Sequence, residues 1–237
     1  MLWHRFWGAA AALLGSAMVL GNALSLATVP DLMADERAFH AARPCAATAS
    51  YDCLRTLQST VRGTVIREQA KNSEYTLRLT GTRPVPSSLH MGDSAPLLRQ
   101  LRAGDLVTVT VWRDYATAVS KHGVPQPSAD TPEGEWLFAT AGALAPLSVG
   151  LFVAWAGMSV LTHAPDYAAL GLPASVALRG KQALGSAFCA IPAGLFGPWT
   201  GQVGVIALWA VLTGLVWTVT RRLDARSKGR HTRPLMP

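Results

Sequence analysis

The stretch Leu106-Val107-Thr108-Val109-Thr110-Val111-Trp112 carries the clearest structural pattern in the chain. Its valines alternate with threonines, and this period of two puts the valines on one face of an extended strand. Gly104-Asp105 turns the chain into this strand, and Arg113-Asp114-Tyr115 predicts a tight turn into a second strand over 116–120. The stretch therefore predicts a β-sheet with one buried face.

The residues before this stretch predict a hairpin of the same kind. Strand-forming residues begin at Leu54, and Gln69-Ala70-Lys71-Asn72-Ser73 is a polar turn. After the turn, the apolar residues Tyr75, Leu77 and Leu79 alternate with polar ones. This alternation is typical of two paired strands that bury one face.

The remaining polar segments define the limits of this domain. Two prolines within 81–86 end the hairpin, because proline is excluded from central strands. Apolar residues at helical spacing predict a short helix over 96–102, and the Pro-, Ser- and Asp-rich segment 123–132 predicts a linker. We expect four or five short strands and one small helix to form a strongly bent sheet or small barrel over 31–135.

The segment that precedes the sheet contains two closely spaced cysteines. Acidic residues come first and basic residues last in 31–43, which predicts a short juxtamembrane helix that Pro44 ends. Cys45 and Cys53 follow, and in an exported domain such a pair is expected to form a structural disulfide. A redox-active pair is the alternative, although the spacing is not Cys-x-x-Cys.

Long apolar runs flank this domain and predict a membrane protein. A helix needs about 20 apolar residues to cross a bilayer, and each run reaches that length. Charged residues are absent between Arg5 and Asp31, between Glu135 and Asp166, and between Lys181 and Arg221.

The first run, 1–30, predicts an uncleaved signal anchor that forms the first transmembrane helix. Ser25-Leu26-Ala27 leaves a cleaved signal peptide as the alternative. Gly8, Ala12 and Ser16 recur at a spacing of four, which permits close approach of a second helix. We expect this face to pack against the protein's own helices.

The C-terminal half predicts further spans. The second transmembrane helix is expected over 136–162, followed by a cytoplasmic loop over 163–181. The run 182–220 is too long for one crossing, and its central Gly197-Pro198-Trp199-Thr200-Gly201 predicts a helical hairpin. Its first arm, 182–196, is short, so a re-entrant segment is the alternative. A basic cytoplasmic tail, 221–237, ends the chain.

The charge distribution predicts the orientation. The formal net charge is +7, yet 31–135 contains 12 basic and 12 acidic residues. All of the excess positive charge flanks apolar runs, which is typical of the positive-inside bias of membrane proteins. We therefore expect an α+β membrane protein with about four transmembrane helices, both termini in the cytoplasm, and the β-rich domain inserted between the first and second helices and exported. Anionic lipid is an expected partner of the basic tail, whereas a nucleic-acid partner is not expected.

The sequence contains no pattern that identifies a catalytic, cofactor or metal site. His40, His90 and His122 lack metal-ligand spacing, so only a zinc site assembled in space is left as an alternative. Asp105 and Asp114 lie nine residues apart, which puts them on opposite faces of a regular strand and argues against a carboxylate dyad. The expected spans lack Asp, Glu, Lys and Arg, which disfavours coupled transport and leaves a passive pore open.

This layout resembles integral membrane proteins of actinobacteria that have a small exported β-rich domain and no characterised activity. The resemblance rests on the single first span, the cysteine pair, Leu101-Arg102-Ala103-Gly104-Asp105 before the strand, and the closing group of spans. It implies location and architecture only. We expect a non-enzymatic protein that presents the domain to an envelope protein or ligand; the alternatives are a redox or enzymatic accessory that uses Cys45 and Cys53, and a passive pore.

Overall fold

The chain folds into two compact units with α+β content. The structure is a computed structural model that describes residues 2–46, 51–70, 72–81 and 83–231. One unit comprises Met1–Leu32 and Gly134–Pro237 and is called the helical unit; the other comprises Met33–Glu133 and is called the barrel unit. Within the described residues, three helices are long and apolar enough to cross a membrane, and six strands form one antiparallel sheet.

The barrel unit is built on one long strand that belongs to both halves of the sheet. The strand order is β3-β2-β1-β4-β5-β6. The first half of β1 pairs with β4 and its second half with β2, and the register shifts between Val61 and Gly63. Such an irregularity bends a strand, as a strongly curved sheet requires. The strands are β1 (Leu54–Arg67), β2 (Glu74–Leu79), β3 (Ser88–His90), β4 (Leu106–Trp112), β5 (Tyr115–Lys121) and β6 (Val124–Pro127).

The two ends of the sheet meet and close it into a small barrel. Met91, directly after β3, forms an antiparallel bridge with Ser128, directly after β6. The backbone N–H of Ala129 donates to the carbonyl oxygen of His90 at 2.9 Å. The expectation of a strongly bent sheet or small barrel over this part of the chain agrees with this arrangement.

The predicted alternation in β4 is confirmed. Val107, Val109 and Val111 are buried, whereas Thr108 and Thr110 are half-buried. Leu77 and Leu79 of β2 are also buried, as the hairpin pattern predicts. Burial of one such side chain contributes about 1.5 to 3 kcal/mol relative to exposure, so this shared face forms the core of the barrel.

The short helical segment predicted within 96–102 is present as a 3₁₀ turn, Leu98–Gln100. Leu97, Leu98 and Leu101 are all buried in the same core. The amide of Gln126, itself 1% exposed, completes the hydrogen bonding of this turn. Its Oε1 accepts from the backbone N–H groups of Leu97 and Leu98, each at 2.8 Å.

The prediction of a linker over 123–132 is wrong, because strand β6 lies within it. Pro125 and Pro127 belong to β6, which pairs with β5. Prolines are tolerated in an edge strand because the N–H that they lack is not needed there. Both prolines are exposed, and Gln126 between them points inward.

The helical unit contains helices that run back and forth. The helices are α1 (Leu2–Ala41, in the helical unit up to Leu32), α2 (Glu135–Thr162), α3 (Ala164–Leu170), α4 (Ala174–Phe188), α5 (Ala190–Leu195) and α6 (Gly197–His231). The candidate spans are α1, α2 and residues Gly197–Arg226 of α6. The second predicted span, 136–162, thus corresponds to α2.

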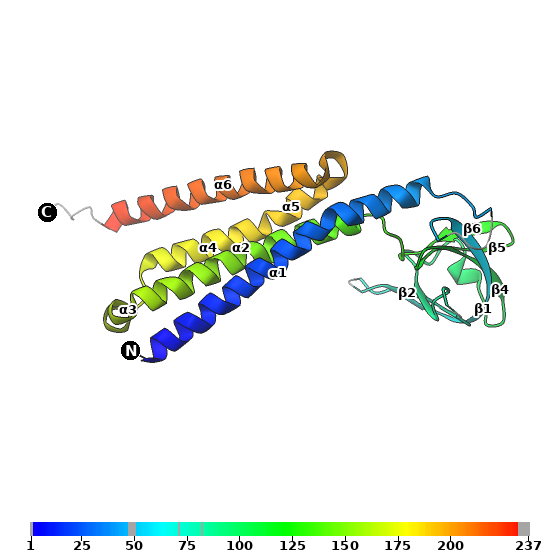
Figure 1. Cartoon of the computed structure of the whole chain (residues 1–237), viewed down its shortest axis with the longest axis horizontal. Coiled ribbons are helices and arrows are strands. Elements are labelled where there is room, and N and C mark those ends of the chain that lie inside the picture. Colours follow the sequence, from blue (N-terminus) through cyan, green and yellow to red (C-terminus); the bar gives the residue numbers. More distant parts are fainter. Residues whose placement is uncertain (1, 47–50, 71, 82, 232–237) are drawn as a thin grey trace. The chain divides into compact units, whose positions relative to one another are not determined.

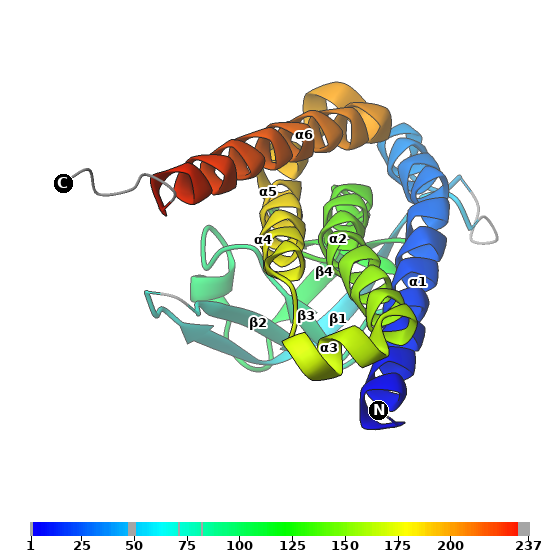
Figure 2. The same cartoon turned by 90° about the vertical axis from the view of Figure 1, so that its left-hand side faces the viewer.

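α1 and α2 pack closely along faces made of small residues. A methyl group on Gly15 would lie 2.2 Å from the Ala154 nitrogen, and one on Gly157 would lie 2.3 Å from the Ala12 nitrogen. Gly8 also faces Gly157. Because Gly8 precedes Gly15 in α1 whereas Gly157 follows Ala154 in α2, the two helices are antiparallel (Figures 1 and 2). The expected close packing against the protein's own helices is confirmed, with Gly15 rather than Ser16 at the contact.

The helix predicted over 31–43 is present as far as Ala41, but it is not a short helix of its own, because α1 continues through Pro30. A proline inside a helix removes one hydrogen bond to the carbonyl four residues earlier, which here is that of Leu26. The side-chain amide of Gln202 donates to this carbonyl oxygen at 3.3 Å. The replacement partner compensates for the bond that the proline removes, as neighbouring helices do in membranes.

The expected loop over 163–181 is also wrong, because it contains α3 and the first half of α4. The run 182–220 does form a helical hairpin, in which α4 and α5 lead away from α3 and α6 returns alongside α4 (Figure 1). Gln182 Nε2 donates to Thr220 Oγ1 at 3.1 Å across this hairpin. Gly201, at φ 65°, lies within the predicted turn and interrupts α6.

One end of the helical unit collects its basic residues. The N-terminus of α1, the end of α2, the start of α4 and the end of α6 all lie at this end (Figures 1 and 2). The turn between α5 and α6 and the start of α2 lie at the other. The basic end, as we call it, carries Arg5, Arg179, Lys181, Arg221 and Arg222.

Candidate functional site

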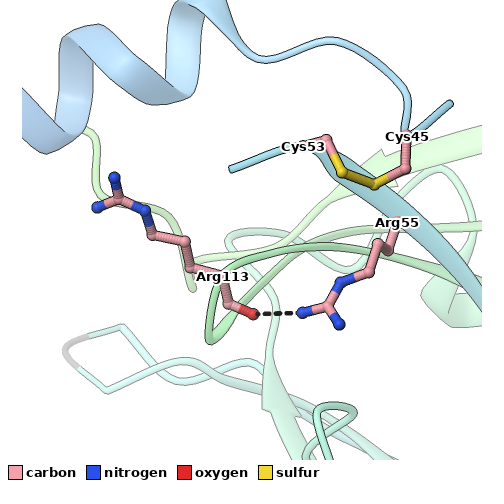
Figure 3. Close-up of a disulfide and its surroundings, with 4 residues drawn as sticks. All are labelled: Cys45, Cys53, Arg55 and Arg113. Atoms are coloured by element: carbon pink, nitrogen blue, oxygen red, sulfur yellow. Dashed lines mark hydrogen bonds between the residues drawn. A yellow bond between two sulfur atoms is a disulfide. The ribbon is translucent and has the colours of Figure 1, made fainter. Parts of the chain in front are cut away.

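The cysteine pair lies at the junction between α1 and β1. A disulfide joins Cys45 to Cys53, with the two Cα atoms 5.0 Å apart (Figure 3). The backbone beside it is also paired, since Cys45 N–H donates to Leu54 O at 3.1 Å and Leu54 N–H donates to Arg43 O at 2.9 Å. Cys53 is buried, which hinders attack by an external thiolate. This arrangement favours a structural role; residues 47–50 of the enclosed loop lie outside the described residues.

Arg113 connects three parts of the barrel unit that are far apart in the sequence. It sits in the turn between β4 and β5 at φ 51°. Its Nε donates to Asp52 Oδ1 at 2.6 Å, and its Nη1 donates to Asp35 Oδ1, in the last turns of α1, at 2.5 Å. The guanidinium also lies 4.3 Å from the centroid of the Trp112 ring. The hydrogen bonds that Arg113 donates to Asp52 and then to Asp35 raise the pKa of Arg113 above its ordinary value, so its charge is permanent.

The neighbours of Arg113 extend this cluster. Arg55 Nη2 donates to the Arg113 carbonyl oxygen at 3.4 Å (Figure 3). Phe39 of α1 contacts the Trp112 ring edge to face, with the centroids 5.5 Å apart. Tyr51 Oη donates to Asp114 Oδ2 at 2.9 Å, and this hydrogen bond raises the pKa of Tyr51. The charged groups of Arg113, Asp35 and Asp52 are therefore paired with one another, and they hold the end of α1 on the barrel. Among the described residues, Arg55 Nε and Trp112 Nε1 in this cluster are shielded from solvent and have no hydrogen-bond partner.

The histidines that the sequence left open as metal ligands are not brought together. His40 lies at the end of α1, His90 in β3 and His122 in the turn between β5 and β6. His90 Nδ1 lies 3.3 Å from Thr76 Oγ1. Across the described part of the chain, no group of three or more His, Cys, Asp or Glu side chains has the arrangement of a metal site.

Asp105 and Asp114 lie at opposite ends of β4 and have different partners. Asp105 Oδ2 lies 2.6 Å from Lys121 Nζ and accepts from the Arg102 backbone N–H at 2.8 Å. The hydrogen bonds from Lys121 and then Arg102 lower the pKa of Asp105. Asp114 accepts from Tyr51. The two carboxylates thus do not form a dyad.

A small hollow lies where the barrel closes. It has a volume of about 240 Å³ and is lined by Ser88, His90 and Asp130, among others. Asp130 Oδ2 already accepts from the backbone N–H of Ala116 at 2.9 Å. The carboxylate therefore supports the local backbone.

A larger cavity, of about 300 Å³, lies in the helical unit between α2, α4 and α6. Its volume is at the lower limit of typical small-molecule sites. Aromatic side chains form most of its wall: Phe152, Trp155, Trp209 and Trp217. The polar side chains that line it are Arg179, Ser148, Ser186 and Thr213.

Hydrogen bonds to Ser186 fix two of the aromatic walls. Trp209 Nε1 donates to the Ser186 carbonyl oxygen at 2.9 Å, and Trp217 Nε1 donates to Ser186 Oγ at 3.3 Å. Ser186 Oγ in turn donates to the Gln182 carbonyl oxygen at 2.8 Å. Thr213 Oγ1 is shielded from solvent and has no hydrogen-bond partner within the described part of the chain.

Arg179 lies at the basic end of the cavity. Its guanidinium carbon is 3.9 Å from the centroid of the Trp155 ring. Among the described residues, no carboxylate lies within 4.0 Å of its nitrogen atoms. Sequence reasoning missed this site because it assigned Arg179 to a loop; had a helix been predicted there, Arg179, Ala183 and Ser186 would have shared one face.

Comparisons with protein families, with curated proteins and with solved structures find no match to this chain. The resemblance to actinobacterial membrane proteins thus receives no support from these comparisons. The geometry of the two units is the basis for any functional conclusion.

Proposed function

We propose that this chain is a multi-pass membrane protein that holds a disulfide-bonded β-barrel outside the cytoplasm, where the barrel binds an envelope protein or ligand without catalysis. The observation that carries this proposal is the collection of basic residues at one end of the helical unit. The chain leaves the helical unit after Leu32 and returns at Gly134, and α2, which begins at Glu135, starts at the opposite end.

The positive-inside bias assigns the basic end to the cytoplasm. The opposite end, from which the chain continues into the barrel unit, then faces outward. Four crossings follow, by α1, α2, the pair α4–α5, and α6. Residues 174–195 of α4 and α5 would rise about 33 Å at about 1.5 Å per residue, of which the charge-free part, 182–195, accounts for about 21 Å. The third crossing therefore requires the long side chains of Arg179 and Lys181 to extend to the cytoplasmic interface.

The burial of Cys53 and the paired backbone beside the disulfide argue for a structural disulfide and against redox chemistry at this pair. The barrel also exposes apolar side chains at one end. Leu106 is 64% exposed and Val124 is 43% exposed, and both lie beside the turns at Gly104 and Gly123. We take these two side chains as the candidate contact point for a partner.

A reporter fusion tests the topology. A reporter that works only in the cytoplasm should be active when it is fused after Pro237. A reporter that works only after export should be active when it is inserted at Gly123. A C-terminus outside the cytoplasm would overturn the four-crossing arrangement.

Site-specific photocrosslinking in the native membrane tests the binding role. A photoreactive residue at Leu106 should capture a defined partner, whereas one at the exposed Gln58 of β1 is the matched control. Val124→Asp should remove the crosslink at 106 without lowering the abundance of the protein. Equal capture at both positions, or none at 106, would contradict the proposal.

A further inference from the structure

We propose that the cavity between α2, α4 and α6 binds one anionic phospholipid. Arg179 would hold the phosphate and the aromatic walls would surround the upper part of an acyl chain. This inference rests on the membrane topology proposed above and adds a specific ligand to it.

The charge at the mouth of the cavity fits an anion. Arg179 stacks on the Trp155 ring, and stacking leaves the edge of the guanidinium free to donate hydrogen bonds. An arginine that lacks a carboxylate partner is suited to bidentate binding of a phosphate. On α6, Arg221 lies over Trp217, with 5.6 Å between the guanidinium carbon and the ring centroid, so a second positive charge lies beside another wall of the same cavity.

The interior of the cavity fits a hydrocarbon chain. From Trp155 to Ser148 the cavity follows α2 for seven residues, which is about 10 Å toward the middle of the helix. Phe152 and Trp209 line this inner part. A ligand with an anionic head at the basic end and an apolar body toward the helix centre has the chemistry of a phospholipid from the cytoplasmic leaflet.

The cavity is open on the side that would face lipid. Leu151 and Trp217 both line it, and they are 52% and 42% exposed. A lipid could therefore enter laterally from the bilayer. Basic pockets between transmembrane helices at the cytoplasmic side are known to hold anionic head groups.

Native mass spectrometry of the full chain in detergent, titrated with phosphatidylglycerol or phosphatidylcholine, tests the proposal. We expect one phosphatidylglycerol to bind per chain, in preference to phosphatidylcholine. Arg179→Gln should lower this preference about fivefold, which is the effect of one basic residue near an anionic head group. Lys181→Gln is the matched control, because it removes the same charge from the same helix without touching the cavity. Ala183→Leu, which fills the cavity without changing charge, should lower binding of both lipids.

Several results would overturn the proposal. Equal losses in Arg179→Gln and Lys181→Gln would indicate general surface attraction, and competition by inorganic phosphate alone would indicate an ion site. If Ala183→Leu fails to fold, the comparison of Arg179→Gln with Lys181→Gln still decides whether Arg179 binds the lipid head group. Because this readout counts bound lipid and not orientation, it is independent of the reporter fusions that test the topology.

Discussion

Gln202 donates a hydrogen bond to the carbonyl oxygen of Leu26, the acceptor that Pro30 deprives of its helical partner. The two residues lie 176 positions apart, in α6 and α1. The bond allows an apolar helix to contain a proline without leaving a carbonyl unpaired in a membrane.

Gln202→Leu should therefore destabilise the helical unit by about 1 to 3 kcal/mol, the cost of an unpaired buried polar group. Pro30→Ala restores the helical N–H, so the same Gln202 substitution should cost less in that background. Thermal unfolding in detergent of the wild type, the two single variants and the double variant measures the coupling between Gln202 and Pro30. An equal cost in both backgrounds would show that the bond is not what Pro30 requires.

Gly15 should tolerate no side chain, because a methyl group there would lie 2.2 Å from a backbone nitrogen of α2. Backbone atoms cannot move aside as side chains do, so Gly15→Ala should cost about 1 to 3 kcal/mol. Gly21→Ala is the matched control on the same helix, because nothing lies within 4 Å of its added methyl group. That control should be neutral or stabilise by about 0.5 to 1 kcal/mol, as measured by unfolding in detergent.

Removal of both cysteines should destabilise the barrel unit by about 2.5 kcal/mol, the loop-entropy value for a separation of this length. The double variant Cys45→Ala/Cys53→Ala and the wild type in reductant should unfold at similar temperatures, because both lack the same crosslink. A fully stable variant with altered thiol–disulfide exchange in membranes would instead support the redox alternative.

Acid should weaken the barrel unit through Asp105. Its pKa is lowered in the folded state, chiefly by Lys121, so the carboxylate contributes stability above its unfolded pKa of about 3.9. That contribution is lost as the pH falls through the lower folded pKa. Asp105→Asn should flatten the dependence of unfolding temperature on pH below the unfolded pKa of the carboxyl group. Lys121→Met should flatten it partly, because the Arg102 hydrogen bond persists; an unchanged profile in both variants would refute the assignment.

Local patterns in the sequence predict much of the barrel unit. Alternation within β4 predicts its buried face, because a strand's side chains alternate regardless of its partners. The cysteine spacing likewise predicts the pairing that the structure contains. Strand β6 was missed because two prolines usually mark a linker, yet an edge strand accepts them and Gln126 between them has its own buried role.

Long-range relationships could not be predicted in this way. The partners of Arg113 are 61 and 78 residues away, so no window of sequence contains them together. The cavity depends on α4 beginning before Arg179, where the charged residues Arg179 and Lys181 between two apolar runs suggested a connecting loop. Pro30 in α1 suggested a helix boundary. The residue that compensates for its missing hydrogen bond, Gln202, lies in another helix, so the local sequence does not contain it.

The pairing of Met91 with Ser128 joins the two outermost strands of the barrel. Many β domains recruit peptides by strand addition, in which the peptide's backbone extends an open sheet edge. In the described part of this sheet, the two outermost strands are joined instead, so this route is closed at that seam. Under the function proposed above, we expect a partner to recognise the shape and charge of side chains on the barrel surface rather than to extend the sheet at this seam.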